Sequence, residues 1–322
     1  MKILVTPTSF LTPPNAPAKA ALENFASEVV YNDLTRPLHA EEVIERLAGV
    51  DGYIAGLDHI TDEVIRAAPE TLKVISRYGI GVDRVDLQAC QKRGIVVTNT
   101  PGTNSIAVCE LAFALMLCAA RNIPRLHNAV ENGQWPRSEG VELHGKVLGI
   151  IGLGAIGKHL AIRAKAFGMK IVAYDSCLDE TFVRFHDFRA LELDALLEQS
   201  DFISLHVPQD STTTRIIDAK TIQRMKTGVI LINTARGGLL DEEAVAEGIR
   251  SGKLGGVGLD AFEEEPLLNS PLKGLDRVIF TPHSGAHTLE AVRSMGHLAV
   301  ENLITVLKGE TSPCCVSCDS DS

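Results

Sequence analysis

Three polar residues with complementary chemistry, Arg236, Glu265 and His283, follow successive apolar runs in the second half of the chain. Imidazole exchanges protons near neutral pH, since its pKa in water is about 6.5, so His283 is suited to general acid–base catalysis. A carboxylate beside it, such as Glu265, favours the imidazolium form and fixes the ring tautomer. Arg236 offers a planar fork that binds a carboxylate through two hydrogen bonds. Together they are the groups that hydride transfer between an alcohol and a nicotinamide cofactor requires from the protein.

Each of these residues also has an ordinary structural interpretation. Arg236 alone is equally consistent with a surface ion pair. Glu265 ends a run of three glutamates, and such runs usually form solvated faces. An isolated histidine such as His283 more often caps a loop than takes part in catalysis. Their shared position favours the catalytic interpretation, because each follows a predicted strand of one parallel sheet, where ligands bind at the carboxyl ends of the strands.

A glycine-rich turn earlier in the chain predicts where the cofactor binds. A buried apolar run leads directly into Gly152, Gly154 and Gly157, with the spacing G-x-G-x-x-G. The first glycine permits a tight turn, the second lets the backbone approach a pyrophosphate, and the third lets the next helix pack closely on its strand. Asp175 follows the next apolar run, about twenty residues on, where an acid binds a ribose 2′-hydroxyl. No Lys or Arg occupies the next three positions, which predicts NAD rather than NADP.

Short apolar runs alternate with helical patterns along most of the chain, which predicts an α/β fold with parallel sheets. Before the glycine turn, strands are expected at 3–6, 29–31, 52–55, 74–77 and 95–98. A second sheet of six strands is expected at 147–151, 170–174, 202–205, 229–233, 256–259 and 278–280. Its spacing fits a Rossmann-type, doubly wound NAD-binding domain.

Two helices and one connection complete this prediction. The stretch 105–120 is apolar on all sides, so it is expected to be buried between domains or against a second subunit. Residues 121–145 are expected to form a long polar loop that contains the only tryptophan, Trp135. We therefore expect a homodimer built on this helix and loop. The last helix, 289–308, is expected to return to the first domain and leave a ligand-binding cleft between the domains.

Length and composition exclude several classes of protein. A chain of 322 residues can bury the cores of two domains. Its 31 basic and 41 acidic residues give a net charge of −10, which argues against nucleic-acid binding and requires local cations for an anionic substrate.

Seven cysteines without framework spacing indicate reduced thiols in a cytoplasmic protein. The cysteines of 313–322 are too few for a metal site, so no metal is expected. The chain starts without a signal-peptide pattern, and its longest apolar run, 111–120, is too short to span a membrane.

In their order along the chain, the motifs resemble those of the D-2-hydroxyacid dehydrogenases. They are G-L-G-x-I-G, an aspartate after the second strand, N-T-A-R-G-G, D-x-F-x-x-E-P and P-H-x-G-A. The resemblance covers nearly the whole chain and stops at the cysteine-rich tail. It implies reversible, NAD-linked oxidation of a 2-hydroxy acid, with the arginine, glutamate and histidine named first as the catalytic residues. It also implies that Ala155, Ile156, Thr234 and Asp260 line the cofactor pocket, with Asp260 near the carboxamide.

The same resemblance implies a discontinuous, flavodoxin-like substrate-binding domain and a dimer through the long helix. Residues 1–100 would form the first part of the substrate-binding domain and 101–286 the NAD-binding domain. Residues 287–312 would form the helix that returns to the substrate-binding domain, and 313–322 a flexible tail.

For the substrate, residues 76–86 and 99–105 look most like the family members that oxidise 3-phosphoglycerate to 3-phosphohydroxypyruvate, the first step of serine biosynthesis. Carried over, Arg77 would bind the phosphate, and the backbone amides of Gly79 and Ile80 would bind the carboxylate together with the catalytic arginine. Arg77 as an ordinary residue at a strand end is the alternative. Enzymes for hydroxypyruvate, glyoxylate or a sulfonated 2-hydroxy acid share the catalytic motifs, so these substrates stay open.

Two features depart from the pattern of the phosphoglycerate dehydrogenases. Their additional C-terminal regulatory domain is absent from this sequence, so serine feedback through it is not expected. Val207 stands where relatives tend to have a hydroxyl residue, which removes one expected cofactor contact.

Two other functions rank lower. NAD-sensing corepressors share the fold, but no partner-recruiting segment is evident here. Formate dehydrogenase pairs its histidine with glutamine, whereas this chain has Glu265.

Overall fold

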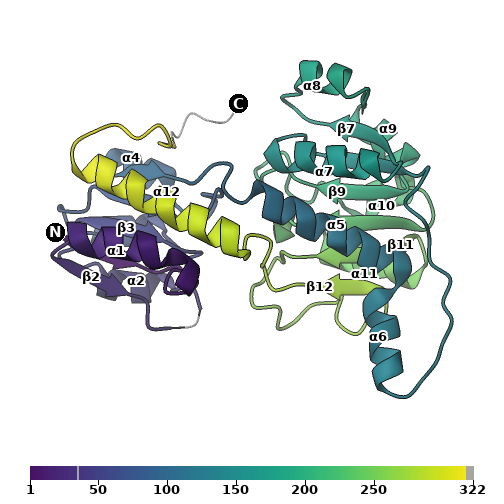
Figure 1. Ribbon diagram of the computed structural model, residues 1–322, viewed down its shortest axis with the longest axis horizontal. Coiled ribbons are helices and arrows are strands. Elements are labelled where there is room, and N and C mark those ends of the chain that lie inside the picture. The colour runs from purple at the N-terminus through teal and green to yellow at the C-terminus, as the bar shows by residue number, and fades with distance from the viewer. Residues whose placement is uncertain (35, 317–322) are drawn as a thin grey trace. The chain divides into compact units, whose positions relative to one another are not determined.

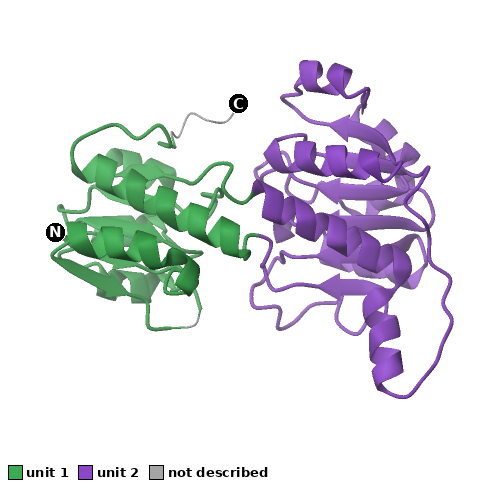
Figure 2. Ribbon diagram, viewed as in Figure 1, with its two compact units in different colours: residues 1–104, 286–322 green, residues 105–285 purple. Residues whose placement is uncertain are grey.

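The computed structural model describes residues 1–34 and 36–316 and divides the chain into two compact units (Figures 1 and 2). The first unit comprises Met1–Asn104 and Ala286–Ser322, and the second comprises Ser105–Gly285. The sequence analysis placed the corresponding boundaries at residues 100 and 286. Each unit is built on one parallel sheet covered by helices, which confirms the predicted fold class.

The first unit has a five-stranded sheet in the order β2-β1-β3-β4-β5. Its strands are β1 (Lys2–Val5), β2 (Glu28–Tyr31), β3 (Gly52–Ala55), β4 (Val74–Arg77) and β5 (Val96–Thr98). This order is that of flavodoxin-like sheets. Every residue of β3 and β4 is buried, as expected for parallel strands covered on both faces, and the predicted strand ends are confirmed to within one residue.

Five α-helices and one short 3-10 helix accompany this sheet. They are η1 (Pro13–Asn15), α1 (Ala16–Phe25), α2 (Ala40–Arg46), α3 (Asp62–Ala67), α4 (Leu87–Lys92) and α12 (Leu289–Leu307). The last helix, α12, packs against α1, β3 and β4. The hydroxyl of Ser76 on β4 donates a hydrogen bond to the carbonyl of Ala299 on α12 (2.8 Å). The helix that follows the second unit in sequence thus belongs to the first.

The chain after α12 pairs with the edge of the same sheet. The Val316 N–H donates to the carbonyl of Val97 on β5 (2.8 Å). The prediction of a flexible tail at 313–322 is therefore wrong as far as Val316, because the unpaired backbone groups of an edge strand bind the passing chain. The rest of that prediction, 317–322, lies outside the described residues.

The second unit has a seven-stranded sheet in the order β12-β11-β10-β9-β6-β7-β8. Its strands are β6 (Val147–Ile151), β7 (Lys170–Tyr174), β8 (Arg189–Ala190), β9 (Phe202–Leu205), β10 (Val229–Asn233), β11 (Leu254–Leu259) and β12 (Val278–Phe280). From β8 the order is that of the Rossmann fold, extended by β12. The prediction of six strands missed β8, because its two exposed residues form no apolar run.

The second unit also contains α5 (Ser105–Arg121), α6 (Ile123–Glu131), α7 (Ala155–Ala166), α8 (Glu180–Phe185), α9 (Leu193–Gln199), α10 (Ala219–Arg224), η2 (Gly237–Leu239) and α11 (Glu242–Arg250). α5 packs against α7, β10 and β11, and within this single chain its other side is partly exposed, with Ile106 52% exposed. Among the described residues, no single helix is long and apolar enough to cross a membrane. α5 and α6 pass that test of length and composition only as a pair bent by 63°.

The structure corrects the prediction that 121–145 is a polar loop, because α6 forms inside it. Asn122 adopts a left-handed conformation (φ 53°), so the chain turns between α5 and α6. Pro124, in the first turn of α6, then starts a new helix, where a missing N–H has no cost. The spacing of Ile123, Leu126 and Val130 is the helical signal that the prediction overlooked, and none of the residues of α6 is buried within the chain.

Candidate active site

The glycine-rich turn joins β6 to α7, and its glycines have different surroundings. Gly152 has a φ of +98°, a conformation that favours glycine. A Cβ on Gly157 would lie 2.2 Å from the carbonyl oxygen of Gly152, so the close packing of α7 on the turn excludes a side chain there. A Cβ on Gly154 would meet no atom within 4 Å. This open space beside the first amides of α7, at Ala155 and Ile156, fits the pyrophosphate of NAD.

Asp175 follows β7 with its carboxylate held by two backbone amides. One oxygen accepts a hydrogen bond from the Leu153 N–H (2.6 Å) and the other from the Cys177 N–H (2.8 Å). The carboxylate is thereby fixed beside the glycine turn, where a ribose diol needs an acceptor. Lys158, in the first turn of α7, is paired with Asp179 (2.6 Å), so its charge is already matched by a carboxylate. Both features fit NAD better than NADP.

Two buried polar atoms at the carboxyl edge of this sheet have no hydrogen-bond partner among the described residues. They are Thr234 Oγ1, after β10, and His206 Nδ1, after β9. The other ring nitrogen of His206 lies 2.9 Å from the hydroxyl of Ser204, and burial lowers the pKa of this histidine to about 4. Buried polar atoms normally have partners, so these two are suited to bind a ligand. His206 is not among the residues predicted from the sequence, although its position after a strand matches that of the other candidates.

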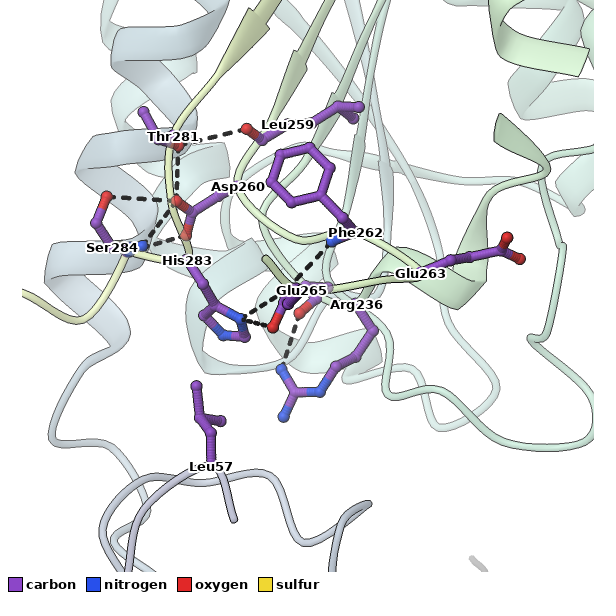
Figure 3. A network of polar contacts seen from close by, with 12 residues as sticks. Leu57, Arg236, Leu259, Asp260, Phe262, Glu263, Glu265, Thr281, His283 and Ser284 are labelled. Atoms are coloured by element: carbon purple, nitrogen blue, oxygen red, sulfur yellow. Dashed lines mark hydrogen bonds and ion pairs between the residues drawn. The ribbon is translucent and has the colours of Figure 1, made fainter. Parts of the chain in front are cut away.

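His283 and Glu265 meet in a direct hydrogen-bonded pair (Figure 3). Nδ1 of His283 lies 2.9 Å and 3.1 Å from the two carboxylate oxygens of Glu265. One of these oxygens also accepts a hydrogen bond from the Phe262 N–H (3.2 Å), which fixes the carboxylate. His283 has a φ of +51°, a left-handed conformation that is uncommon outside glycine and is often found at functional sites. The pairing uses Nδ1, which leaves Nε2 as the nitrogen for proton exchange.

The turn after β10 directs Arg236 toward this pair. The side chain of Asn233 holds the turn, because its Nδ2 donates to the Arg236 carbonyl (2.7 Å) and its Oδ1 accepts from the Ala235 N–H (3.0 Å). A Cβ on Gly237 would lie 1.9 Å from the carbonyl carbon of Phe262, so this turn packs directly on the loop of Glu265. Figure 3 shows Glu265 between His283 and Arg236. The three residues therefore lie together within the second unit.

Asp260, which follows β11, holds the loop that carries His283. Its side chain is 2% exposed. One oxygen accepts hydrogen bonds from the Thr281 hydroxyl (2.6 Å) and the Ser284 N–H (2.8 Å), and the other from the Gly285 N–H (2.8 Å), as Figure 3 shows in part. Contact with the nicotinamide carboxamide stays a prediction for Asp260. The structure adds that the carboxylate positions both flanks of the histidine.

The predicted substrate residues lie in the first unit, at the end of β4 and directly after it. Arg77 is 5% exposed, and its Nη1 donates to the carbonyls of Ala55 (3.2 Å) and Tyr78 (2.6 Å). Gly79 has a φ of +137°, and its N–H donates to the hydroxyl of Thr100 (3.0 Å). Ile80 is 41% exposed. The arginine is therefore buried under the loop whose amides were predicted to bind the substrate carboxylate.

No group of three or more metal-binding side chains is found in the described part of the chain. The second unit does hold an acid–base pair, a guanidinium and a dinucleotide turn on one sheet. A histidine oriented by a carboxylate can move a proton, and an arginine beside it can bind a carboxylate and polarise a neighbouring carbonyl. These are the protein groups that a nicotinamide-dependent oxidation of a 2-hydroxy acid requires.

Comparison with known proteins agrees with this chemistry. The D-isomer specific 2-hydroxyacid dehydrogenase NAD-binding domain matches residues 113–285. The chain is 42% identical to D-3-phosphoglycerate dehydrogenase of Methanocaldococcus jannaschii over 314 residues, which cover 96% of this chain and 58% of that protein. It is 44% identical to hydroxypyruvate reductase of Thermotoga maritima over 276 residues, which cover 84% and 89% of the two proteins. The structure of D-lactate dehydrogenase from Aquifex aeolicus complexed with NAD and lactic acid matches with a TM-score of 0.85, 30% identity and 96% coverage of both chains.

The chain thus spans little more than half the length of the phosphoglycerate dehydrogenase and most of the length of the reductase. The family domain covers the glycine turn and the loops of all three predicted catalytic residues. This chain belongs to the D-isomer specific 2-hydroxyacid dehydrogenase family and carries its NAD-binding domain.

Proposed function

We propose that this protein interconverts a D-2-hydroxy acid and its 2-oxo acid with NAD as the redox partner. The observation that carries this proposal is the pairing of His283 Nδ1 with Glu265, beside Arg236. These residues lie in the second unit, whose sheet also carries the dinucleotide turn after β6. Pairing at Nδ1 fixes which ring nitrogen is available to the substrate.

In the oxidation direction, Nε2 of His283 takes the proton of the C2 hydroxyl. The carboxylate of Glu265 stabilises the imidazolium that results. Arg236 binds the substrate carboxylate and orients C2, and it polarises the oxygen that becomes a carbonyl. NAD, when bound, accepts the hydride from C2. In the reduction direction His283 returns the proton to the carbonyl oxygen.

The cofactor residues of this proposal are the three glycines of the turn with Ala155 and Ile156 at the pyrophosphate, and Asp175 at the ribose. Thr234 and Asp260 line the pocket at the nicotinamide end, and the partnerless hydroxyl of Thr234 supports this role. The experiment that tests the reaction follows NADH absorbance with a panel of 2-oxo acids and both reduced cofactors. We expect turnover with NADH and little with NADPH. Absence of turnover with every 2-oxo acid would contradict the proposal and favour a corepressor-like binding protein.

For the substrate, we propose 3-phosphoglycerate, oxidised to 3-phosphohydroxypyruvate as the first step of serine biosynthesis. The loop 76–86 and the phosphoglycerate dehydrogenase relative support this choice. The substrate residues of this proposal are Arg236 and the Ile80 amide for the carboxylate, with Arg77 as one candidate for the phosphate. The Gly79 N–H, predicted to bind the carboxylate, instead donates to the Thr100 hydroxyl within the chain. The relative named hydroxypyruvate reductase favours a second candidate, reduction of hydroxypyruvate or glyoxylate. A sulfonated 2-hydroxy acid such as sulfolactate is the third.

We also propose a cytoplasmic homodimer assembled through α5, α6 and the segment after them. Three apolar side chains on α6 and the segment after it are exposed in the single chain: Ile123 (48%), Val130 (50%) and Trp135 (81%). Cys109, Cys118, Cys177, Cys314 and Cys315 are thiols outside any disulfide, which fits the cytoplasm. Light scattering at micromolar concentration should give twice the mass of the chain. Replacing Val130 and Trp135 by serine should yield monomers, whereas Phe185→Ser on α8, at an 83% exposed site, should not.

A further inference from the structure

The loop after β11 carries Glu265, and it contains no helix or strand between Asp260 and Arg277. Hydrogen bonds with the Phe262 N–H and with His283 fix the Glu265 carboxylate relative to this loop and to the histidine. They do not fix the backbone of the loop on the rest of the unit. That backbone needs its own anchor, because displacing a positioned group by about 1 Å can lower a rate by a factor of about 10².

A buried carboxylate on the neighbouring helix supplies this anchor. Glu242, the first residue of α11, is 9% exposed. Its Oε1 accepts a hydrogen bond from the Glu263 N–H (3.2 Å), and its Oε2 accepts one from the Ser270 hydroxyl (2.6 Å). One side chain therefore holds two points of the loop, one before Glu265 and one after it.

The anchor acts on the peptide group between Phe262 and Glu263. A Cβ on Gly237 would lie 1.9 Å from the carbonyl carbon of Phe262 and 2.3 Å from the nitrogen of Glu263, so the turn after β10 packs on the same peptide group. The N–H of Phe262, one residue earlier, binds the Glu265 carboxylate. The anchoring bond is thus one residue away from the bond that holds Glu265.

The surroundings of Glu242 differ from those of an ion pair. Among the described residues, no lysine or arginine pairs with this carboxylate, and its two hydrogen-bond donors are neutral. Burial of a carboxylate without a cation costs free energy, which such hydrogen bonds offset in part. The side chain of Glu263 points away from the pair of Glu265 and His283 in Figure 3 and binds Arg215 (3.4 Å). It is therefore the backbone of Glu263 that contacts Glu242.

We propose that Glu242 is a positioning residue for the acid–base pair, which fixes the loop so that the Glu265 carboxylate meets Nδ1 of His283. The inference rests on the proposed function, since it concerns the residues of that reaction. The reach of the side chain matters more than its charge, because one end must accept from an N–H while the other meets a hydroxyl. Glutamine has the same reach and can make both contacts, whereas aspartate keeps the charge but is one methylene shorter.

The first test compares the kcat of Glu242→Gln and Glu242→Asp in NADH-dependent reduction of hydroxypyruvate, glyoxylate and 3-phosphohydroxypyruvate. We expect Glu242→Asp to lower kcat about tenfold and Glu242→Gln to stay within about twofold of the native value. The dissociation constant of NADH, followed by its fluorescence, should be unchanged in both, since the dinucleotide turn is on another loop. Glu243→Asp, which shortens the exposed neighbour on α11, is the matched control and should keep the native kcat.

Two outcomes of this comparison would overturn the proposal. One is a native kcat in Glu242→Asp. The other is a larger loss in Glu242→Gln than in Glu242→Asp, because the residue would then act through its charge.

The second test asks whether Glu242 acts through Glu265. In a Glu265→Ala background the loop no longer carries the carboxylate that is positioned, so adding Glu242→Asp should lower the remaining kcat by no more than about twofold. A further tenfold loss would indicate a general effect on the fold and would contradict the positioning role.

The third test needs no turnover. The proton shared by His283 Nδ1 and Glu265 should give a downfield NMR resonance, assigned by its loss in Glu265→Ala. We expect this resonance to shift or broaden in Glu242→Asp and to keep its position in Glu242→Gln and Glu243→Asp. An unchanged resonance in Glu242→Asp would count against the inference.

The results separate this inference from the reaction itself. If the native protein reduces one of the three acids but Glu242→Asp changes neither kcat nor the resonance, only the positioning role of Glu242 is overturned. If the native protein reduces none of them, the proposed function fails, and a role of Glu242 in that reaction fails with it.

Discussion

The carboxyl edges of the two sheets differ in the groups that shape them, which are backbone atoms in one unit and side chains in the other. In the second unit, the edge is shaped by backbone: glycines at 152, 157 and 237 allow approaches that a single methyl group would block. In the first unit, long side chains shape the edge: Arg77 is buried under a loop, and Arg84 lies beside His59. The comparison shows that close backbone packing shapes the edge with the dinucleotide turn, whereas the burial of individual side chains shapes the edge of the first unit.

The largest expected effect tests the acid–base pair of the second unit. His283→Ala should lower kcat by a factor of about 10² to 10⁴, because positioned proton transfer is lost. Binding of NADH, followed by its fluorescence, should be retained, since the dinucleotide turn is on other loops of the sheet. Native turnover by this variant would remove His283 from the mechanism.

Next in size is a pair of glycine substitutions in the cofactor turn. Gly157→Ala should lower the free energy of unfolding by about 3 kcal/mol or more, because the new Cβ would lie 2.2 Å from a carbonyl oxygen. Gly154→Ala should leave the melting temperature nearly unchanged, since its Cβ meets no protein atom within 4 Å, yet weaken NAD binding. Thermal unfolding and NAD titration of both variants check this. Equal loss of stability in the two would contradict the separate roles.

A smaller effect concerns pH, since burial lowers the pKa of His206 to about 4 from its ordinary value of 6.5. Between these values the unfolded chain binds more protons than the folded one, so stability falls as pH decreases from 6.5 toward 4. Urea unfolding at pH 7 and pH 4.5 should show that the native protein loses on the order of 2 kcal/mol more than His206→Gln does. His59→Gln should change this loss less, because His59 is exposed. If His59→Gln changed the loss of stability more than His206→Gln, the buried histidine would not be the one that sets the pH dependence.

The smallest expected effect concerns cofactor choice. Asp175→Ala should lower the preference for NAD over NADP by about tenfold, because the ribose loses a charged acceptor while the 2′-phosphate loses a repelling carboxylate. Glu180→Gln, at an exposed site on α8, serves as the control. Ratios of kcat/KM for the two cofactors measure the change. An enzyme that already uses both equally would contradict the role of Asp175.

Much of the fold was predictable from local patterns. Strands such as β3, β6 and β10 are nearly continuous apolar runs, and their ends were predicted to within a residue. The two residues of β8 have no such run, and only pairing with β7 makes them a strand. α6 was missed although Ile123, Leu126 and Val130 have helical spacing, because the residues around them are polar and the stretch was read as one connection.

For the site, sequence by itself determined the residue types, their order and the glycine spacing, because close backbone approach leaves only glycine possible at a few positions. Tertiary structure decided what each charged group does. Arg77 ends β4 and Arg84 lies in the loop that follows, yet one is buried against carbonyls and the other lies beside a histidine from a different loop. The order of the segment up to Val316 likewise depends on tertiary structure, because this segment pairs with the edge of β5. Burial and pairing are set by segments far apart in the chain, and no local pattern records them.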